Sequence, residues 1–89
     1  MTDQEINEAV AYACGWIYYD GWNHSDGRNQ LPNYCSDLNA MHEAEKMLTR
    51  EQIDDYIVLL FDSTYEATLA TARQRAEVFL KTLGKWKNA

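Results

Sequence analysis

Apolar residues recur every three or four positions at the start of the chain, which predicts an amphipathic helix. Thr2 and Glu5 have the spacing of a capping box, in which each side chain binds the other residue's free backbone N–H. Gly15 is a natural end for this helix, because glycine enters the left-handed C′ conformation without strain. The expected buried face consists of Ile6, Ala9, Val10 and Ala13.

Three further helices are predicted downstream. The second begins at Ser36 or Asp37, either of which can cap free N–H groups. Its apolar stripe is Met41, Ala44, Met47 and Leu48, flanked by Leu38 and Ala40. The third begins with another capping-box pair, Thr49 and Gln52. Its apolar stripe is Ile53, Tyr56, Ile57 and Leu60. The apolar run 57–61 indicates either deep burial or a partial strand, and the cap favours a helix.

The fourth predicted helix is the longest. Ser63 and Glu66 have capping-box spacing, and Gly84 would close a helix of about 20 residues that forms the spine of the domain. Its stripe is Leu69, Ala72, Ala76, Phe79, Leu80 and Leu83.

Between Gly15 and Ser36 the pattern changes to that of strands and turns. The run 16–19 is aromatic and β-branched, and Asp20-Gly21 and Asp26-Gly27 are turn dipeptides. We predict a hairpin with Trp16 to about His24 on one side and Arg28 to Leu31 on the other. Trp16 and Tyr18 would then share one face, and Ile17 and Tyr19 the other. The fold class is therefore α+β and predominantly helical, with about four helices plus a short β-hairpin or small sheet.

Length and composition indicate a single small domain over residues 1–89. The chain has a mass of 10.3 kDa, and 46% of its residues are hydrophobic, enough for one core. Four apolar stripes and eleven aromatic residues exceed what a lone chain of this size hides, so we expect a homodimer or a higher closed oligomer. No apolar run approaches the roughly 18–20 residues of a membrane span, and the N-terminus is acidic. We therefore expect a cytoplasmic protein, with Cys14 and Cys35 as free thiols.

Charge is distributed unevenly along the chain. The net charge is −6, which argues against non-specific nucleic-acid binding, because phosphate affinity needs a basic surface. Residues 73–89 nevertheless hold five bases and one acid. The bases either complement the end of a helix dipole or form a small anion-accepting patch, for which Arg73 and Arg75 are the candidates.

Nothing in the sequence calls for catalysis. His42 has Glu43 and Glu45 beside it, but a metal site needs three or more ligands with defined spacing, so neither a metal nor another cofactor is expected. No activating motif surrounds either cysteine, and no glycine-rich phosphate loop is present. An enzyme is accordingly the less favoured hypothesis.

The unusual feature is the density of aromatic residues in the stretch 16–34. These rings either fill a small core or form a recognition surface for a protein or a flat ligand such as a nucleobase. The candidate binding residues are Trp16, Tyr18, Tyr19, Trp22, His24, Arg28 and Tyr34.

Three segments carry a family resemblance: 32–46, 13–16, and 70–77 with 83–86. The run from Pro32 to Lys46 resembles the core motif of the phage ABA sandwich domain family, and the other two resemble that family's first-helix ending and closing helix. Members are small phage and prophage proteins without an established common function. The family name implies a sheet between helices, and the chain departs from the pattern at 17–31 and between the third and fourth helices.

Two binding functions are open at this point. The resemblance favours a non-enzymatic, phage-encoded accessory protein that binds a host protein, in host interaction or counter-defence, in the cytoplasm of the infected bacterium. The alternative is an oligomeric sequestering protein for a nucleotide-like immune signal, with Arg28, Arg73 or Arg75 meeting phosphates while aromatic rings stack on the base.

Overall fold

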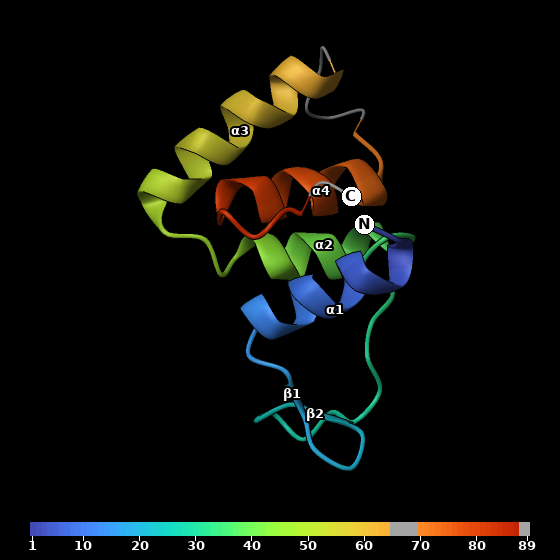
Figure 1. Ribbon diagram of the computed structural model, residues 1–89. Coiled ribbons are helices and arrows are strands. Elements are labelled where there is room, and N and C mark those ends of the chain that lie inside the picture. The colour runs from blue at the N-terminus through green and yellow to red at the C-terminus, as the bar shows by residue number, and fades with distance from the viewer. Residues whose placement is uncertain (65–69, 88–89) are drawn as a thin grey trace.

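The computed structural model describes residues 1–64 and 70–87. In this part of the chain it holds four helices and one two-stranded antiparallel sheet (Figure 1). The fold is α+β and 54% helical, as predicted. The elements in order are α1 (Asp3–Ala13), β1 (Ile17–Tyr18), β2 (Trp22–Asn23), α2 (Leu38–Glu45), α3 (Arg50–Thr64) and α4 (Ala72–Thr82).

Helix α4 is the centre of the packing, since it contacts α1, α2 and α3. Figure 1 shows α1, α2 and α4 side by side, α3 along the outer edge, and the hairpin projecting beyond the end of α1. The largest completely buried side chains lie where these helices meet: Trp16, Phe79, Ile6, Met41, Leu60, Leu80, Val10 and Val78.

The predicted helix starts are confirmed where they depend on local hydrogen bonds. Thr2 and Glu5 form the reciprocal capping box, and Asp37 caps α2 by accepting from two backbone N–H groups. Thr49 and Gln52 likewise exchange bonds of 2.9 and 3.2 Å at the start of α3. Gly15, just beyond the end of α1, takes the positive φ of 90° that suits glycine.

The fourth helix is shorter than predicted and begins elsewhere. Ser63 belongs to the last turn of α3, and α4 has 11 residues. Its cap is Thr71, which forms a capping box with Gln74 through bonds of 2.9 and 3.1 Å. Because this pair satisfies the free N–H groups, the helix starts there. Glu66 and Leu69, named in the prediction, lie outside the described residues.

The predicted hairpin exists, but its register is different. Both strands fall inside the segment expected to form the first strand, with Ile17 opposite Asn23 and Tyr18 opposite Trp22. The chain reverses at Asp20-Gly21, where both residues take positive φ (52° and 110°). Asp26-Gly27 makes a second turn, closed by a 3.0 Å bond from His24 N–H to the Arg28 carbonyl. Residues 28–31 are therefore not a strand.

Burial also departs from prediction in two helices. Met47 is exposed and lies beyond Glu45, where α2 ends, whereas Leu48 of the same predicted stripe is buried. In α3, Tyr56 and Leu60 are buried, whereas Ile53 and Ile57 are exposed. The prediction of deep burial for the run 57–61 was therefore wrong for every residue except Leu60.

Candidate functional site

Three aromatic rings, two of them exposed, contact one another at the hairpin end of the molecule. The Trp22 ring lies between Tyr12, with ring centroids 5.0 Å apart, and Tyr18, with centroids 5.3 Å apart. Tyr12 and Tyr18 are 58% and 61% exposed, and Trp22 is partly buried. We call Tyr12, Tyr18 and Trp22 the aromatic surface.

Two local features build the aromatic surface. The pairing of Tyr18 with Trp22 puts these side chains on one face of the hairpin. The turn at Gly15 then brings that face beside the last turn of α1, which carries Tyr12. Tyr12 was missed in the sequence reasoning, although it lies off the apolar stripe of α1 and could have been identified as an exposed aromatic residue. Tyr19, in the hairpin turn, is exposed as well.

Trp16 and Tyr34, two of the candidate binding residues, lie in the core. Trp16 therefore does not share a face with Tyr18, as had been predicted. It precedes β1, and its backbone N–H binds the Ala11 carbonyl at 3.0 Å, which turns the side chain inward. The Arg28 guanidinium lies over the Trp16 ring, 5.0 Å from its centroid.

His24, Asp26 and Arg28 form one polar cluster that holds the loop after β2. Asp26 accepts from the Arg28 side chain at 2.7 Å and from the Arg28 backbone N–H at 3.0 Å. The backbone hydrogen bond is the main cause of a lowered pKa at Asp26. His24 Nε2 lies 3.0 Å from the Cys14 carbonyl oxygen, which can only accept, so Nε2 is the donor. The cluster fastens the loop to the end of α1.

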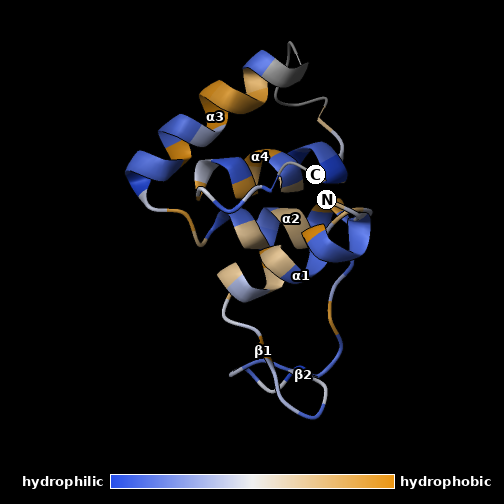
Figure 2. Cartoon of the chain, viewed as in Figure 1, coloured by the Kyte–Doolittle hydropathy of each residue, from blue (hydrophilic) through white to orange (hydrophobic). Residues whose placement is uncertain are grey.

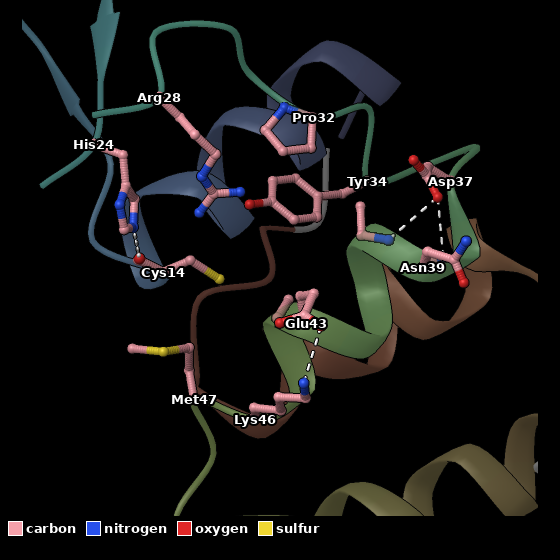
Figure 3. Close-up of a pocket in the computed structure, with 12 residues that line it drawn as sticks. Cys14, His24, Arg28, Pro32, Tyr34, Asp37, Asn39, Glu43, Lys46 and Met47 are labelled. Carbon is pink, nitrogen blue, oxygen red and sulfur yellow. Dashed lines mark hydrogen bonds and ion pairs between the residues drawn. The ribbon is translucent and has the colours of Figure 1, made fainter. Parts of the chain in front are cut away.

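A cavity of about 510 Å³ opens beside this cluster, between the 24–34 segment and α2 (Figure 3). Figure 3 shows the Arg28 guanidinium and the Tyr34 hydroxyl facing one another above the Cys14 thiol. The charged residues that line the cavity are of both signs: Arg28, Lys46, Asp37 and Glu43. Lys46 binds Glu43 at 2.9 Å, and Asp37 caps α2.

The buried thiol and phenol of this cavity are poor nucleophiles at neutral pH. Burial raises the pKa of Cys14 to about 11 and that of Tyr34 to about 12. A reactive cysteine needs the opposite shift, because the thiolate is the attacking species. His24, moreover, contacts the carbonyl of Cys14 rather than its sulfur.

The candidate anion-binding residues Arg73 and Arg75 are both engaged with carboxylates. Arg73 binds Asp3 at 2.9 Å and lies 3.8 Å from Glu77. Arg75 reaches both oxygens of Glu45 at 3.2 Å. These ion pairs join α4 to α1 and to α2, and they compete with any anion for the two guanidinium groups. His42 lies 3.4 Å from Glu45, one of the two partners expected for it.

Two further features of the described residues concern metal binding and membrane insertion. These residues contain no group of three or more His, Cys, Asp or Glu residues arranged to hold a metal ion. Across 1–64 and 70–87, no helix has the length and apolar character needed to cross a membrane. Both cysteines are free thiols, as predicted.

The chain was compared with protein-family models, curated proteins and solved structures, and none of them matches it.

Proposed function

We propose that this protein is a non-enzymatic binding module that docks on a partner protein through its aromatic surface. The observation that carries the proposal is the cluster of Tyr12, Trp22 and Tyr18, whose rings contact one another at the hairpin end of the fold. Tyrosine and tryptophan are enriched at binding hot spots, where they bury a large area. Because these rings already hold one another in place, docking would order few side chains and lose little entropy.

The charge beside the aromatic surface indicates the kind of partner. Glu8 lies one helical turn before Tyr12 on the same side of α1, and Asp20 lies in the turn that joins Tyr18 to Trp22. The whole chain carries a net charge of −6. An apolar centre with an acidic rim fits a protein surface that has an apolar pocket and basic residues around it.

The setting of the proposal comes from the resemblance to phage ABA sandwich domain proteins. On that basis the partner is a host protein, met in the cytoplasm of an infected bacterium, and the role is host interaction or counter-defence. The acidic surface supports a protein partner over nucleic acid, because a phosphate backbone would be repelled.

A second candidate function is sequestration of a small nucleotide-like anion in the cavity. Its support is Arg28, which lies over Trp16 and faces Tyr34 at the cavity. Its weakness is the balance of charges, since Asp37 and Glu43 line the same cavity as Arg28 and Lys46.

The test compares the aromatic surface with an exposed apolar residue elsewhere on the molecule. Partners captured from a bacterial lysate are identified, purified and titrated against the wild type and against Tyr18→Ala, Trp22→Ala and Leu38→Ala. We expect the first two variants to lose about thirtyfold or more in affinity, as for removal of a hot-spot anchor. Leu38, on α2, is 42% exposed and is not part of the aromatic surface, so it serves as the control.

Two results would count against a protein partner bound in this way. One is unchanged affinity in folded Tyr18→Ala and Trp22→Ala proteins. The other is a stoichiometric small anion, found by mass spectrometry after heating the purified protein, whose binding is lost on Arg28→Ala. That second result would establish sequestration instead.

A further inference from the structure

Helix α3 has a second apolar face that the described residues leave uncovered. Ile53, Ile57 and Phe61 follow one another at intervals of four residues, so they lie along one side of the helix, with Val58 beside them. These four side chains are between 36% and 60% exposed. We call Ile53, Ile57, Val58 and Phe61 the α3 stripe.

The α3 stripe is distinct from the contact that holds α3 in the fold. Helix α3 packs on α4, and its buried side chains are Tyr56 and Leu60. The stripe begins beside these two and continues around the helix toward solvent. Figure 2 shows strongly hydrophobic segments of α3 at the outer edge of the molecule.

We propose that the α3 stripe is the interface of a homodimer, in which a second copy of the chain covers it with its own α3 in antiparallel orientation. The stripe is self-complementary about its middle residue. When two antiparallel helices meet at Ile57, the Ile53 position of one lies opposite the Phe61 position of the other. A two-fold axis at Ile57 therefore matches apolar residues with apolar residues over the full stripe.

The charges on α3 select the antiparallel orientation. Asp54, three residues before Ile57, lies at the edge of the stripe, so a parallel pair would bring it toward its own copy. An antiparallel pair centred on Ile57 instead separates the two copies of Asp54 by about 9 Å along the helix axes. It also opposes the two helix dipoles, which favours the arrangement.

The size of the α3 stripe can be compared with the area that a dimer interface buries. Its exposed apolar area is on the order of 400 Å², the size of the largest apolar patch on a typical protein, and such a patch is often functional. A standard interface buries about 800 Å² on each partner, so the stripe would supply the apolar half and the flanking polar residues the rim.

The proposed dimer does not depend on the aromatic surface. Figure 1 shows α3 and the hairpin at opposite ends of the molecule. A dimer joined through α3 would therefore carry two aromatic surfaces, both free to bind partners.

The test is a measurement of mass in solution with two matched isoleucine variants. Light scattering after size exclusion should give twice the 10.3 kDa of the chain for the wild type. Ile57→Asp should give the monomer, with a circular dichroism spectrum like that of the wild type. Ile17→Asp, on the hairpin, is the control: Ile17 is more exposed than Ile57, and this variant should stay dimeric.

A cysteine placed on the proposed axis gives a second measurement. In a Cys35→Ser background, Ile57→Cys should form a disulfide-linked dimer on mild oxidation, because the two copies of residue 57 would face each other. Ile17→Cys should stay uncrosslinked. The proposal is overturned if the wild type is monomeric up to its solubility limit. It is equally overturned if Ile57→Asp stays dimeric, and a dimer lost only in Ile17→Asp would place the interface on the hairpin.

Discussion

The Arg75–Glu45 pair joins α4 to α2 in the interior of the helical body, and its removal should destabilise the protein. The guanidinium reaches both carboxylate oxygens at 3.2 Å, and the two side chains are 11% and 21% exposed. Tyr56 of α3 lies against both charges, where burial raises the pKa of its hydroxyl. Glu45→Ala therefore leaves a nearly buried guanidinium without its carboxylate at the junction of three helices.

The expected loss follows from the burial of the pair. Removing one partner of a fully buried ion pair costs about 3–5 kcal/mol, because the remaining charge is desolvated and uncompensated. Partial exposure of both side chains reduces the figure to about 2–3 kcal/mol. For a domain of this size, such a loss lowers Tm by roughly 10–20 °C.

A neighbouring glutamate provides the control. Glu43, also on α2, binds Lys46 at 2.9 Å, which is shorter than the contacts of Arg75 with Glu45. That pair is exposed, with its side chains 70% and 71% accessible, so Glu43→Ala should cost no more than about 0.5 kcal/mol. We expect the burial of an ion pair, rather than its donor–acceptor distance, to determine which of the two pairs contributes more to stability.

Urea unfolding followed by circular dichroism measures both variants. The double variant Glu45→Leu/Arg75→Met should recover much of the stability lost in Glu45→Ala, because it removes both charges and keeps the volume. The reasoning is refuted if Glu43→Ala is as destabilising as Glu45→Ala, or if the double variant is less stable than the single one.

Three other predictions follow from the hairpin end of the fold. In the native protein, iodoacetamide should modify Cys35 faster than Cys14, because Cys14 is buried and its pKa is raised to about 11; peptide mass mapping that shows equal rates would contradict this. Stability should fall as pH rises from about 9 to 12, because the unfolded thiol and phenol ionise near their ordinary pKa values of 9.0 and 10.0, whereas folded Cys14 and Tyr34 keep their protons up to about pH 11 and 12. The fall between pH 10 and 12 should be shallower in Tyr34→Phe, and an unchanged slope would exclude Tyr34 as a cause. Gly15→Ala should lower the free energy of unfolding, measured in urea, by about 1–2 kcal/mol, because φ at this position is +90°. A loss of less than a few tenths of a kcal/mol would show that the turn adapts to a side chain.

Helix starts were predictable because a cap is a contact between residues three positions apart. The pairs Thr2–Glu5 and Thr49–Gln52 form the hydrogen bonds that their spacing implies. The same rule misplaced the start of α4, because the Thr71–Gln74 pair has that spacing too and was not weighed against Ser63. The local signal was present twice, and capping-box spacing alone does not choose between the two.

The hairpin register could not be obtained in this way, because two Asp-Gly dipeptides lie within the stretch. Reversal at Asp20-Gly21 lets Tyr18 stack on Trp22, and through Trp22 on Tyr12. Reversal at Asp26-Gly27 would have paired Trp22 with residues beyond Arg28. The choice depends on a contact with α1, ten residues earlier in sequence, which no local rule records. The aromatic surface was consequently only half predicted: Tyr18 and Trp22 were named, and Tyr12 was not.

The exposed face of α3 shows what an amphipathic pattern leaves open. A run of apolar residues at helical spacing identifies a face that avoids water, but it does not say which surface covers that face. Helix α3 has 15 residues and α4 has 11, which correspond to lengths of about 22 and 16 Å. The longer helix carries two adjoining apolar faces, and the single face that α4 turns toward it covers Tyr56 and Leu60. A chain that builds its core on one short central helix has no further element among the described residues to cover Ile57 and Phe61. A second copy of the same helix supplies a surface of matching length and composition.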